Sequence, residues 1–272
     1  MKKFTATKTE SLKSFTDSTY PQGSFYFSRL LKARDIRVNG ERTGKDVTLS
    51  PGDEVTYYTT AEQEARRAFS VLYRDSDILV ADKDSGVNSE AVFFTLSQEE
   101  EGLCFIHRLD RNTQGLIAFA RNAGAERALL SAFRERRARK LYQAVCVGRP
   151  PRDQGVLTAY LKKDAGRSLV SVSDRPDGGE RIVTEYRVVR LRPDGLSDVE
   201  IVLHSGKTHQ IRAHMAHIGC PVLGDTKYGD SAANARFSRT RQCLVAKELT
   251  LDTQGKLPKT DKRTFVSEFS LW

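Results

Sequence analysis

The segment His107-Arg108-Leu109-Asp110-Arg111-Asn112-Thr113-Gln114-Gly115-Leu116 crowds charged and polar side chains into a short stretch that ends at a glycine. It leads directly into the apolar run Leu116–Phe119, which is typical of a buried strand. A loop that feeds a strand can hold one carboxylate among cations, and nearby positive charge favours the ionised form of Asp110. The same pattern also fits a surface loop with a helix cap or a salt bridge, so the residue types alone leave both interpretations open.

Apolar runs of strand length dominate the rest of the chain after Phe69. Strands are expected over Ile78–Val80, Leu116–Phe119, Leu141–Val147, Ile182–Leu191 and Val199–Leu203. Helical periodicity is found over Ala123–Arg134 and Thr208–Ile218, and the second helix should end before Gly219. Many strands, few helices and mostly short connections predict an α+β fold with a large mixed, mainly antiparallel sheet. We expect Ala165–Glu180 to be a mobile loop.

A smaller unit precedes this sheet and runs to about Thr60. Its expected elements are a helix over Phe25–Ala33 and short strands over Asp35–Val38, Val47–Leu49 and Glu54–Tyr57, with turns at Asn39-Gly40 and Pro51-Gly52-Asp53. Basic residues cluster on it, namely Arg29, Lys32, Arg34, Arg37 and Arg42. Thr59–Arg67 is polar and is expected to link the two units.

The composition favours a polyanionic partner. The 272 residues include 44 Lys and Arg against 35 Asp and Glu, which gives a net charge of +9 and a pI of about 9.4. The excess is local, because residues 121–149 hold eight basic and two acidic side chains whereas residues 1–65 hold ten and nine. Such a patch points to phosphate binding more strongly than net charge does. No run approaches ~18 apolar residues and no apolar signal region follows Met1, so we expect neither a membrane span nor secretion.

The cysteines Cys104, Cys146, Cys220 and Cys243 lie far apart without a CxxC pair. This spacing is typical of neither a zinc site nor a disulfide framework, and reduced thiols in a cytoplasmic protein are expected.

Four of the five histidines lie within residues 203–219. Thr208 is expected to cap the following helix, whose first amides together with Lys207 would suit an anion such as phosphate. A zinc site is the competing interpretation, because His214 and His217 share one helical face, but no HExxH pattern is present. We expect at least two of the four histidines to be structural.

The basic stretch Arg134–Tyr142 also has two interpretations. It fits a solvated helix end, or a track for phosphates with Tyr142 just inside the following strand. An aromatic ring beside cations is what base stacking requires.

Three motifs occur in one order: HRLD-x-x-T-x-G-L before an apolar strand, then K-x-Y, then G-K-T-H-Q-I-R-x-H-x-x-x-I-G-x-P-V-x-G-D-x-x-Y-G. Together they resemble the RluA-type family of RNA pseudouridine synthases, and the resemblance covers about Phe69–Trp272. The first sixty residues are similar to the small αL-type RNA-binding domain often fused to these enzymes, through RLLKARDIRVNG and the PGDEV turn. The resemblance therefore predicts an αL-like domain over residues 1–62 and a catalytic domain over residues 68–272.

The resemblance implies roles for individual positions. The family's catalytic aspartate corresponds to Asp110, its active-site tyrosine to Tyr142 and the basic partner of the aspartate to Arg212. Arg108 is expected to help hold a flipped-out nucleotide. Further contacts with RNA are expected from His107, Thr113, Lys140, Lys207, Thr208 and His209, and from Arg29, Lys32 and Arg34 on the N-terminal unit.

The implied reaction breaks the bond between uracil and ribose and rejoins the base through carbon. No atoms are gained or lost, so no cofactor and no metal are expected, in keeping with the lack of GxGxxG and GxxxxGK[ST] motifs. The uridine must leave the stacked RNA, at about a few kcal/mol, and Asp110 then attacks the sugar or removes a proton from it. The expected partner is RNA, with ribosomal RNA preferred and transfer RNA possible, and the expected state is a cytoplasmic monomer without an obligate protein partner.

Two positions depart from the family's pattern. Residues 83–86 read Lys-Asp-Ser-Gly where the family has Lys-Pro-x-Gly, and Gln114 stands where serine is common. Both bear on loop geometry and substrate choice.

Two other functions stay open. The first is a catalytically inactive RNA-binding protein, against which the joint presence of Asp110, Tyr142 and Arg212 counts. The second is a metal-dependent nuclease or hydrolase built on the histidines.

Overall fold

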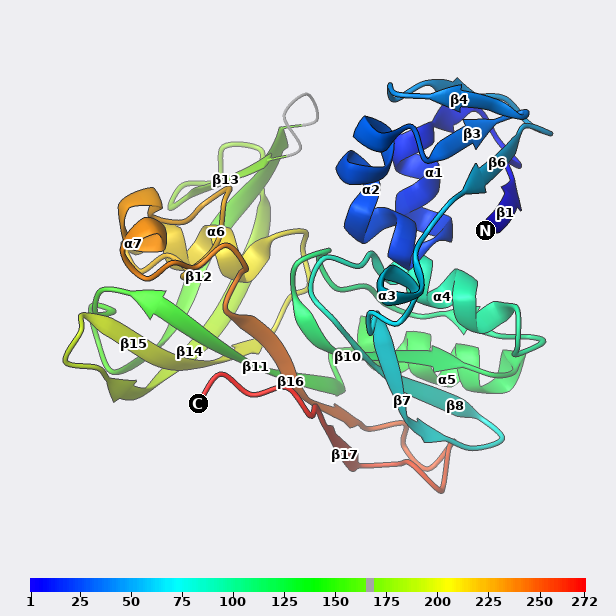
Figure 1. Ribbon diagram of the computed structural model, residues 1–272. Coiled ribbons are helices and arrows are strands. Elements are labelled where there is room, and N and C mark those ends of the chain that lie inside the picture. Colours follow the sequence, from blue (N-terminus) through cyan, green and yellow to red (C-terminus); the bar gives the residue numbers. More distant parts are fainter. Residues whose placement is uncertain (165–168) are drawn as a thin grey trace.

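The computed structural model describes residues 1–164 and 169–272, and within them the largest element is a sheet of 11 strands. The strands are β7 (Phe69–Arg74), β8 (Ile78–Lys83), β9 (Cys104–Phe105), β10 (Gln114–Ala120), β11 (Ala138–Val147), β12 (Gln154–Asp164), β13 (Leu169–Ser173), β14 (Glu180–Leu191), β15 (Leu196–Leu203), β16 (Leu244–Leu251) and β17 (Arg263–Val266). They are ordered β13-β12-β14-β15-β11-β16-β10-β8-β7, with β9 beside β10 and β17 beside β16 (Figure 1). Only β10 and β16 pair in parallel among these described strands. The predicted fold class is confirmed.

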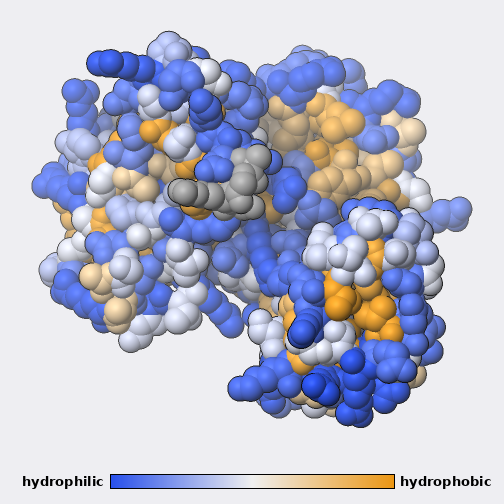
Figure 2. Space-filling model, turned by 90° about the horizontal axis from the view of Figure 1, so that it is seen from above, coloured by the Kyte–Doolittle hydropathy of each residue, from blue (hydrophilic) through white to orange (hydrophobic). Residues whose placement is uncertain are grey.

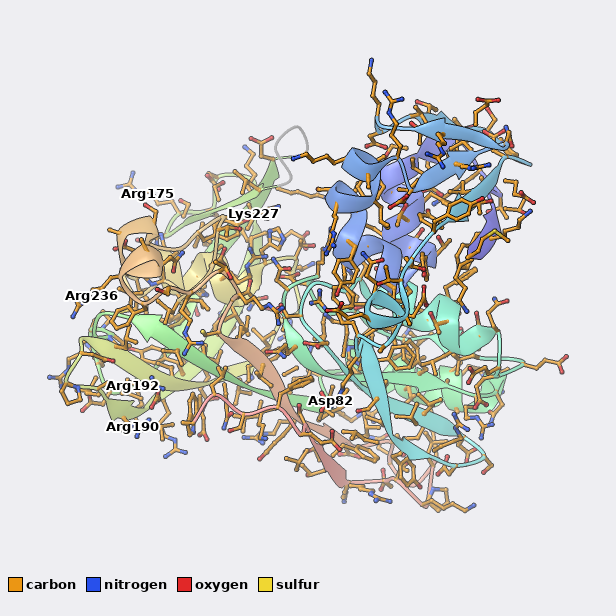
Figure 3. All side chains as sticks on the ribbon, in the orientation of Figure 1. Asp82, Arg175, Arg190, Arg192, Lys227 and Arg236 are labelled. Atoms are coloured by element: carbon orange, nitrogen blue, oxygen red, sulfur yellow. The ribbon has the colours of Figure 1, made fainter. Side chains whose placement is uncertain are left out.

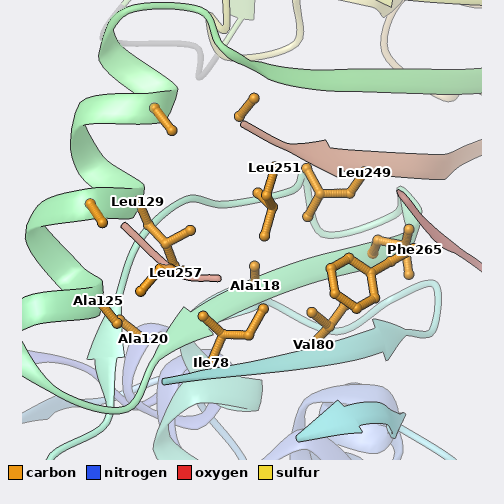
Figure 4. Close-up of a cluster of buried hydrophobic side chains, with 14 residues drawn as sticks. Ile78, Val80, Ala118, Ala120, Ala125, Leu129, Leu249, Leu251, Leu257 and Phe265 are labelled. Carbon is orange, nitrogen blue, oxygen red and sulfur yellow. The ribbon is translucent and has the colours of Figure 1, made fainter. Parts of the chain in front are cut away.

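The strands β8 and β10 read as continuous apolar runs because helices cover both of their faces. On one face, Ile78 and Val80 pack with Leu129 of α5 (Ala123–Arg134). Leu251 and Phe265 close this cluster from the later strands, as Figure 4 shows. The alternate residues of β8 and β10 face α4 (Ser89–Ser97) on the other side.

The other half of the sheet carries α6 (Gln210–His217), whose Ile211 and Met215 pack with Val199 and Ile201 of β15. The short helix α7 (Ser231–Arg236) follows α6. At the outer end of this half, Figure 3 shows Arg190 and Arg192 far from the N-terminal unit. There they form ion pairs with the buried Asp198.

Gly115 allows β10 and β16 to approach unusually closely. Its φ is +111°, and a Cβ at this position would lie 2.3 Å from the carbonyl oxygen of Ala246. Any larger residue would push the two backbones apart, so steric contact explains why the T-x-G-L motif has a glycine at this position.

The N-terminal unit has a separate sheet, ordered β1-β6-β3-β4, with two helices against it. Its elements are β1 (Lys2–Thr5), β2 (Glu10–Ser11), α1 (Leu12–Thr19), α2 (Pro21–Ala33), β3 (Ile36–Val38), β4 (Glu41–Thr43), β5 (Thr48–Leu49), β6 (Glu54–Tyr57) and α3 (Ala61–Glu64). Its own buried cluster includes Leu12, Leu30 and Val55. The Asn39-Gly40 turn has positive φ at both residues, as its sequence predicted. The domain limits at residues 62 and 68 stay a prediction.

Several element predictions need correction. The expected helix over Phe25–Ala33 begins at Pro21, and the expected linker Thr59–Arg67 contains α3. The loop expected over Ala165–Glu180 contains β13, which pairs with β12, while residues 165–168 lie outside the described residues. None of the described helices is long and apolar enough to cross a membrane.

Candidate active site

A cavity of about 480 Å³ lies where the segment 106–113, the end of α5, the start of β11 and the loop before α6 meet. Ten of the predicted site residues line it: His107, Arg108, Asp110, Thr113, Lys140, Tyr142, Lys207, Thr208, His209 and Arg212. Arg29, Lys32 and Arg34 do not. They are exposed on or just after α2, which lies on the side of the N-terminal unit that faces β12 and β13 (Figure 1). Seen from above, hydrophilic side chains dominate the recess between the two parts of the molecule (Figure 2).

The carboxylate of Asp110 is held at one oxygen and open at the other. Nη1 of Arg212 donates to Oδ2 of Asp110 at 3.1 Å, and the Asp110 side chain is 21% exposed. No described residue donates a hydrogen bond to Oδ1. The arrangement therefore fixes the orientation of the carboxylate while leaving one oxygen free for a ligand in the cavity.

Arg212 is itself held by a second carboxylate, that of Asp225. Nε and Nη2 of Arg212 donate to the two oxygens of Asp225 at 2.6 and 2.9 Å, and the amides of Lys227 and Tyr228 donate to Oδ1 as well. Both side chains are buried, with exposures of 6% for Arg212 and 0% for Asp225. This bidentate pair leaves only Nη1 to reach Asp110, so the guanidinium bridges the two carboxylates in one geometry.

The two buried partners stabilise each other's charged form. Burial by itself would raise the pKa of Asp225, but the hydrogen bonds and charge of Arg212 and two backbone amides lower it overall. Burial likewise works against the charge of Arg212, and the two carboxylates, Asp225 first and Asp110 next, outweigh it and raise the pKa of Arg212. The cation beside Asp110 is thus permanently charged.

Tyr142 forms part of the wall next to Asp110. It lies on β11, where burial and then the Asp110 carboxylate raise the pKa of the phenol. Its hydroxyl makes no hydrogen bond with any described residue. The ring is therefore a neutral flat surface, and its hydroxyl is left for a ligand.

Lys83 forms hydrogen bonds with the backbone of the loop that carries Asp110 and of the neighbouring segment 84–87. This buried ammonium donates to the backbone carbonyl oxygens of Asp84, Val87 and Arg111 at 3.1, 2.9 and 3.0 Å. Ser85 adds a hydrogen bond to the carbonyl oxygen of Asn112 at 3.1 Å. Three carbonyl acceptors use all three N–H groups of an ammonium, so the loop is held at several backbone positions.

Arg111, the residue after Asp110, connects this loop to the N-terminal unit. Its guanidinium donates to Asp17 of α1 at 3.1 Å, to the carbonyl and hydroxyl oxygens of Ser24 of α2 at 3.1 Å each, and to the carbonyl oxygen of Gly86 at 3.1 Å. The N-terminal unit is therefore hydrogen-bonded directly to the residue beside the candidate carboxylate.

The two departures from the family's pattern contact each other. Nε2 of Gln114 donates to Oδ1 of Asp84 at 3.1 Å, and Oδ1 also accepts from the amide of Ser85. The amide of Asp84 donates to the carbonyl oxygen of Ala68 at 2.8 Å, a bond that proline cannot make. The loop geometry put in question by the missing proline is thus supported by hydrogen bonds.

The expected cap at Thr208 is wrong. The helix α6 begins at Gln210, and the residue before it, His209, has a φ of +56° and no side-chain cap. The amide of Lys207 is used by Oε1 of Gln210 at 3.1 Å, and its ammonium pairs with Glu180. An exposed loop with one left-handed residue therefore stands where a capped helix end was expected.

Each of the four clustered histidines has a partner of its own. His204 contacts Glu185, His209 contacts the hydroxyl of Tyr228, His214 contacts Thr184 and His217 contacts Asp174, all at 2.8–2.9 Å. Burial and then His217 lower the pKa of His214 to about 4, so this ring is a neutral structural group. Within the described residues, no three His, Cys, Asp or Glu side chains gather as a metal site would require.

Other predicted residues lie at the edge or beneath the cavity. Arg108 is exposed at the rim and pairs with Glu90 at 3.0 Å. Thr113 is buried, and its hydroxyl accepts from Nε2 of Gln242 at 3.0 Å. Their predicted contacts with RNA stay predictions.

Asp225, Lys83 and Arg111 are not among the site residues predicted from the sequence. A signal existed for Asp225, since it belongs to the quoted G-D-x-x-Y-G motif, and for Lys83, since it opens the Lys-x-x-Gly stretch. No spacing rule pairs Arg111 with Asp17, because they lie in different units.

Comparisons with known proteins show which family the chain resembles. Residues 69–217 match the family of RNA pseudouridylate synthases. The ribosomal large subunit pseudouridine synthase C of Rickettsia bellii is 27% identical over 85% of this chain and 88% of its own. The dual-specificity RNA pseudouridine synthase RluA of Haemophilus influenzae is 32% identical over 66% of this chain and 85% of its own.

Among solved structures, that of human RNA pseudouridylate synthase domain containing 1 is similar, with a TM-score of 0.61 and 26% identity over 75% of this chain and 91% of that one. The family match over residues 69–217 includes every residue that lines the cavity except Leu244, and the relatives cover most of the chain. The chain therefore belongs to the RluA-type family of RNA pseudouridine synthases, isomerases that act on RNA.

Proposed function

We propose that the enzyme converts specific uridines of ribosomal RNA to pseudouridine in the cavity around Asp110, with Asp110, Tyr142 and Arg212 as its active-site residues. The observation that carries the proposal is the state of the Asp110 carboxylate. One oxygen is fixed by Arg212 at 3.1 Å, the other accepts from no described residue, and Asp110 and Tyr142 both line the cavity.

The reaction balances within one nucleoside. The bond between N1 of uracil and C1′ of ribose breaks, the base turns, and a bond forms between C5 and C1′. The proton on C5 leaves and N1 gains one, so no cofactor takes part. Asp110 either attacks C1′ and forms an ester or removes the proton from C2′, and both routes need an ionised carboxylate with a free oxygen.

Tyr142 is positioned to stack on the extruded base. A uridine inside stacked RNA cannot reach the cavity, so it flips out at a cost of about a few kcal/mol. A neutral aromatic ring replaces part of the lost stacking. The exposed cations Arg29, Lys32 and Arg34 on the N-terminal unit would supply phosphate contacts that offset the rest.

The choice of ribosomal RNA rests on relatives. The Rickettsia bellii protein is named as an enzyme of the large ribosomal subunit. Transfer RNA is the alternative substrate, and mapping pseudouridine in cellular RNA with and without the gene decides between the two. We propose further that the enzyme acts as a monomer.

The test of the active site is release of tritium from RNA labelled at C5 of uracil. The wild-type enzyme should release it, and Asp110→Asn should release none while binding RNA with nearly unchanged affinity, because the change is almost isosteric. Substantial turnover by the variant would remove Asp110 from its role. A wild-type enzyme that binds RNA without releasing tritium would instead identify an inactive RNA-binding protein. Unchanged turnover with a strong chelator present would exclude the metal-dependent alternative.

A second measurement separates the two routes for Asp110. Deuterium at C2′ of the target ribose should slow turnover if Asp110 removes that proton in a rate-limiting step. If Asp110 attacks C1′, a nucleoside linked to the Asp110 side chain should be trapped on rapid denaturation.

A further inference from the structure

Lys140 is a partly buried cation for which the described chain provides no acceptor. Its ammonium lies 5.6 Å from the ring centre of Phe133, and a Cβ at Gly206 would stand 3.3 Å from Nζ. No oxygen of residues 1–164 or 169–272 accepts a hydrogen bond from it. Lys83 and Lys247, by contrast, donate to backbone carbonyl oxygens at 2.7–3.1 Å. A desolvated charge without a partner is unfavourable, so Lys140 is suited to an acceptor from outside the chain.

His107 presents a second unused donor beside Lys140. Its Nε2 accepts a hydrogen bond from the amide of Ala118 at 3.0 Å, which requires Nδ1 to carry the proton of the neutral ring. Burial, and then Lys140, lower the pKa of His107 to about 3, so the ring stays neutral. The ring stacks on Phe133 with centres 4.5 Å apart. No described residue accepts from Nδ1, and both side chains line the cavity.

The wall around these two donors favours an anion over a neutral ligand. Asp110 is the only carboxylate among the described residues that line the cavity, and Arg212 already pairs with it. Arg134 adds a cation at the rim, with its side chain 77% exposed. The side-chain groups of Lys140, His107 and Arg134 on this wall are all N–H donors.

The spacing along β11 relates this wall to the reacting nucleoside. Lys140 and Tyr142 lie two residues apart on the same face of the strand, which places their backbones about 7 Å apart. This is comparable to the distance between the base and the phosphate of one nucleotide. A nucleoside stacked on Tyr142 therefore has a phosphodiester within reach of Lys140.

We propose that Lys140 and His107 form a binding site for a single phosphodiester of the substrate RNA, the one adjoining the uridine that reacts. The site rests on the proposed function and specifies it further, because it assigns one end of the cavity to the RNA backbone and the other to the sugar and base. Phe133 holds both donors in place, and the cation and the N–H group approach one phosphate together.

The test compares Lys140→Met with the wild-type enzyme on an RNA oligonucleotide that spans a converted uridine. The KM should rise by about 10- to 100-fold, the loss expected for one charge-assisted hydrogen bond, with kcat nearly unchanged. The melting temperature should stay the same or rise, because the variant removes a partly buried charge that has no partner among the described residues. Lys256→Met, which changes an exposed lysine outside the cavity, is the matched control and should leave KM unchanged.

Two binding measurements identify the ligand group as a phosphate. The slope of log Kd against log salt concentration should fall by about 0.7 in Lys140→Met and by nothing in the control. A neutral methylphosphonate on one side of the target uridine, with 2′-deoxy sugars flanking it against cleavage, should weaken binding to the wild-type enzyme. The same change should have little further effect on Lys140→Met.

Equal losses for both enzymes with the neutral linkage on either side would overturn the proposal, as would an unchanged salt slope. A lower melting temperature with an unchanged KM would show that Lys140 is structural. Absence of turnover by the wild-type enzyme on every RNA would instead count against the proposed function, so the two failures are distinguishable.

Discussion

The two ends of the cavity differ in how far the protein satisfies its own charges. At one end, Arg212 donates two hydrogen bonds to Asp225 and a third to Asp110, so both carboxylates are paired with a cation of the chain. At the other end, Lys140 and His107 find no acceptor among the described residues. The first end is organised before any ligand arrives, whereas the second is completed only by a ligand. The proposed reaction needs the first arrangement, because its carboxylate must not reorient during the reaction, and the proposed phosphate binding suits the second.

The largest effect is expected from Arg212→Met, which removes the guanidinium that bridges Asp110 and Asp225. The variant leaves Asp225 buried without its partner, so the free energy of unfolding should fall by about 3–5 kcal/mol. Turnover should be lost together with the orientation of Asp110. Urea unfolding and tritium release measure the two losses. A folded variant with substantial turnover would show that the bridge is not needed for the reaction.

The same variant has a defined pH dependence. The pKa of Asp225 is lowered in the folded state, so its contribution is present above the unfolded value of about 4 and is lost as the pH falls through the folded value. The difference in stability between wild type and Arg212→Met should therefore be greatest near neutral pH and shrink below about pH 4. Urea unfolding at several pH values measures it, and a constant difference would contradict this origin.

Tyr142→Phe is expected to have the next largest effect, and on one property only. The hydroxyl has no hydrogen bond in the described structure, so the free energy of unfolding should change by less than about 0.5 kcal/mol. If the hydroxyl takes part in proton transfer, as a group left free in the cavity suggests, kcat should fall by about 10²- to 10⁴-fold. Single-turnover kinetics measure this, and near-normal activity would leave stacking as the only role of the ring.

A smaller effect is expected at the junction with the N-terminal unit. Asp17→Asn weakens the ion pair with Arg111, which is worth about 0.5–1.5 kcal/mol and corresponds to about a two- to tenfold loss in kcat/KM. The matched control is Glu54→Gln, which breaks the exposed pair with Lys3 in the same unit and should change nothing. Equal behaviour of the two variants would show that the junction does not influence Asp110.

The smallest effect is expected for the contact between Asp84 and Gln114. A double-mutant cycle with Asp84→Ala and Gln114→Ser should give a coupling of about 0.5–1.5 kcal/mol in unfolding free energy. Fully additive changes would show that the hydrogen bond between Asp84 and Gln114 does not contribute to stability.

The sequence predicted regular elements well where the pattern was amphipathic or flanked by clear stop signals. The helix Ala123–Arg134 has its predicted limits because its apolar residues recur on one face. The helix α4 escaped prediction because its apolar run Ala91–Phe94 shows no polar face. The strand β13 was missed because polar and glycine-rich segments surround it. The left-handed residue at His209 displaced the expected cap at Thr208, and no local pattern announces such a backbone.

The sequence predicted which residues form the candidate site, but not the hydrogen bonds that connect them. Motif order indicated Asp110, Tyr142 and Arg212, and the structure brings all three to one cavity. The bridge to Asp225 depends on a loop that returns to α6 after a turn, and the link from Arg111 to Asp17 depends on how two units pack. Both are tertiary facts that spacing along the chain does not contain.

The close contact of Gly115 with Ala246 has a consequence for biosynthesis. Asp110 lies just before β10, and β10 pairs with β16, which is synthesised some 130 residues later. Arg212 and Asp225 are also synthesised about 100 residues or more after Asp110. The N-terminal sheet has all of its strands by Tyr57. On a ribosome, the small unit can therefore fold before the large sheet has been made, whereas the cavity assembles only after Arg212 and β16 have been synthesised.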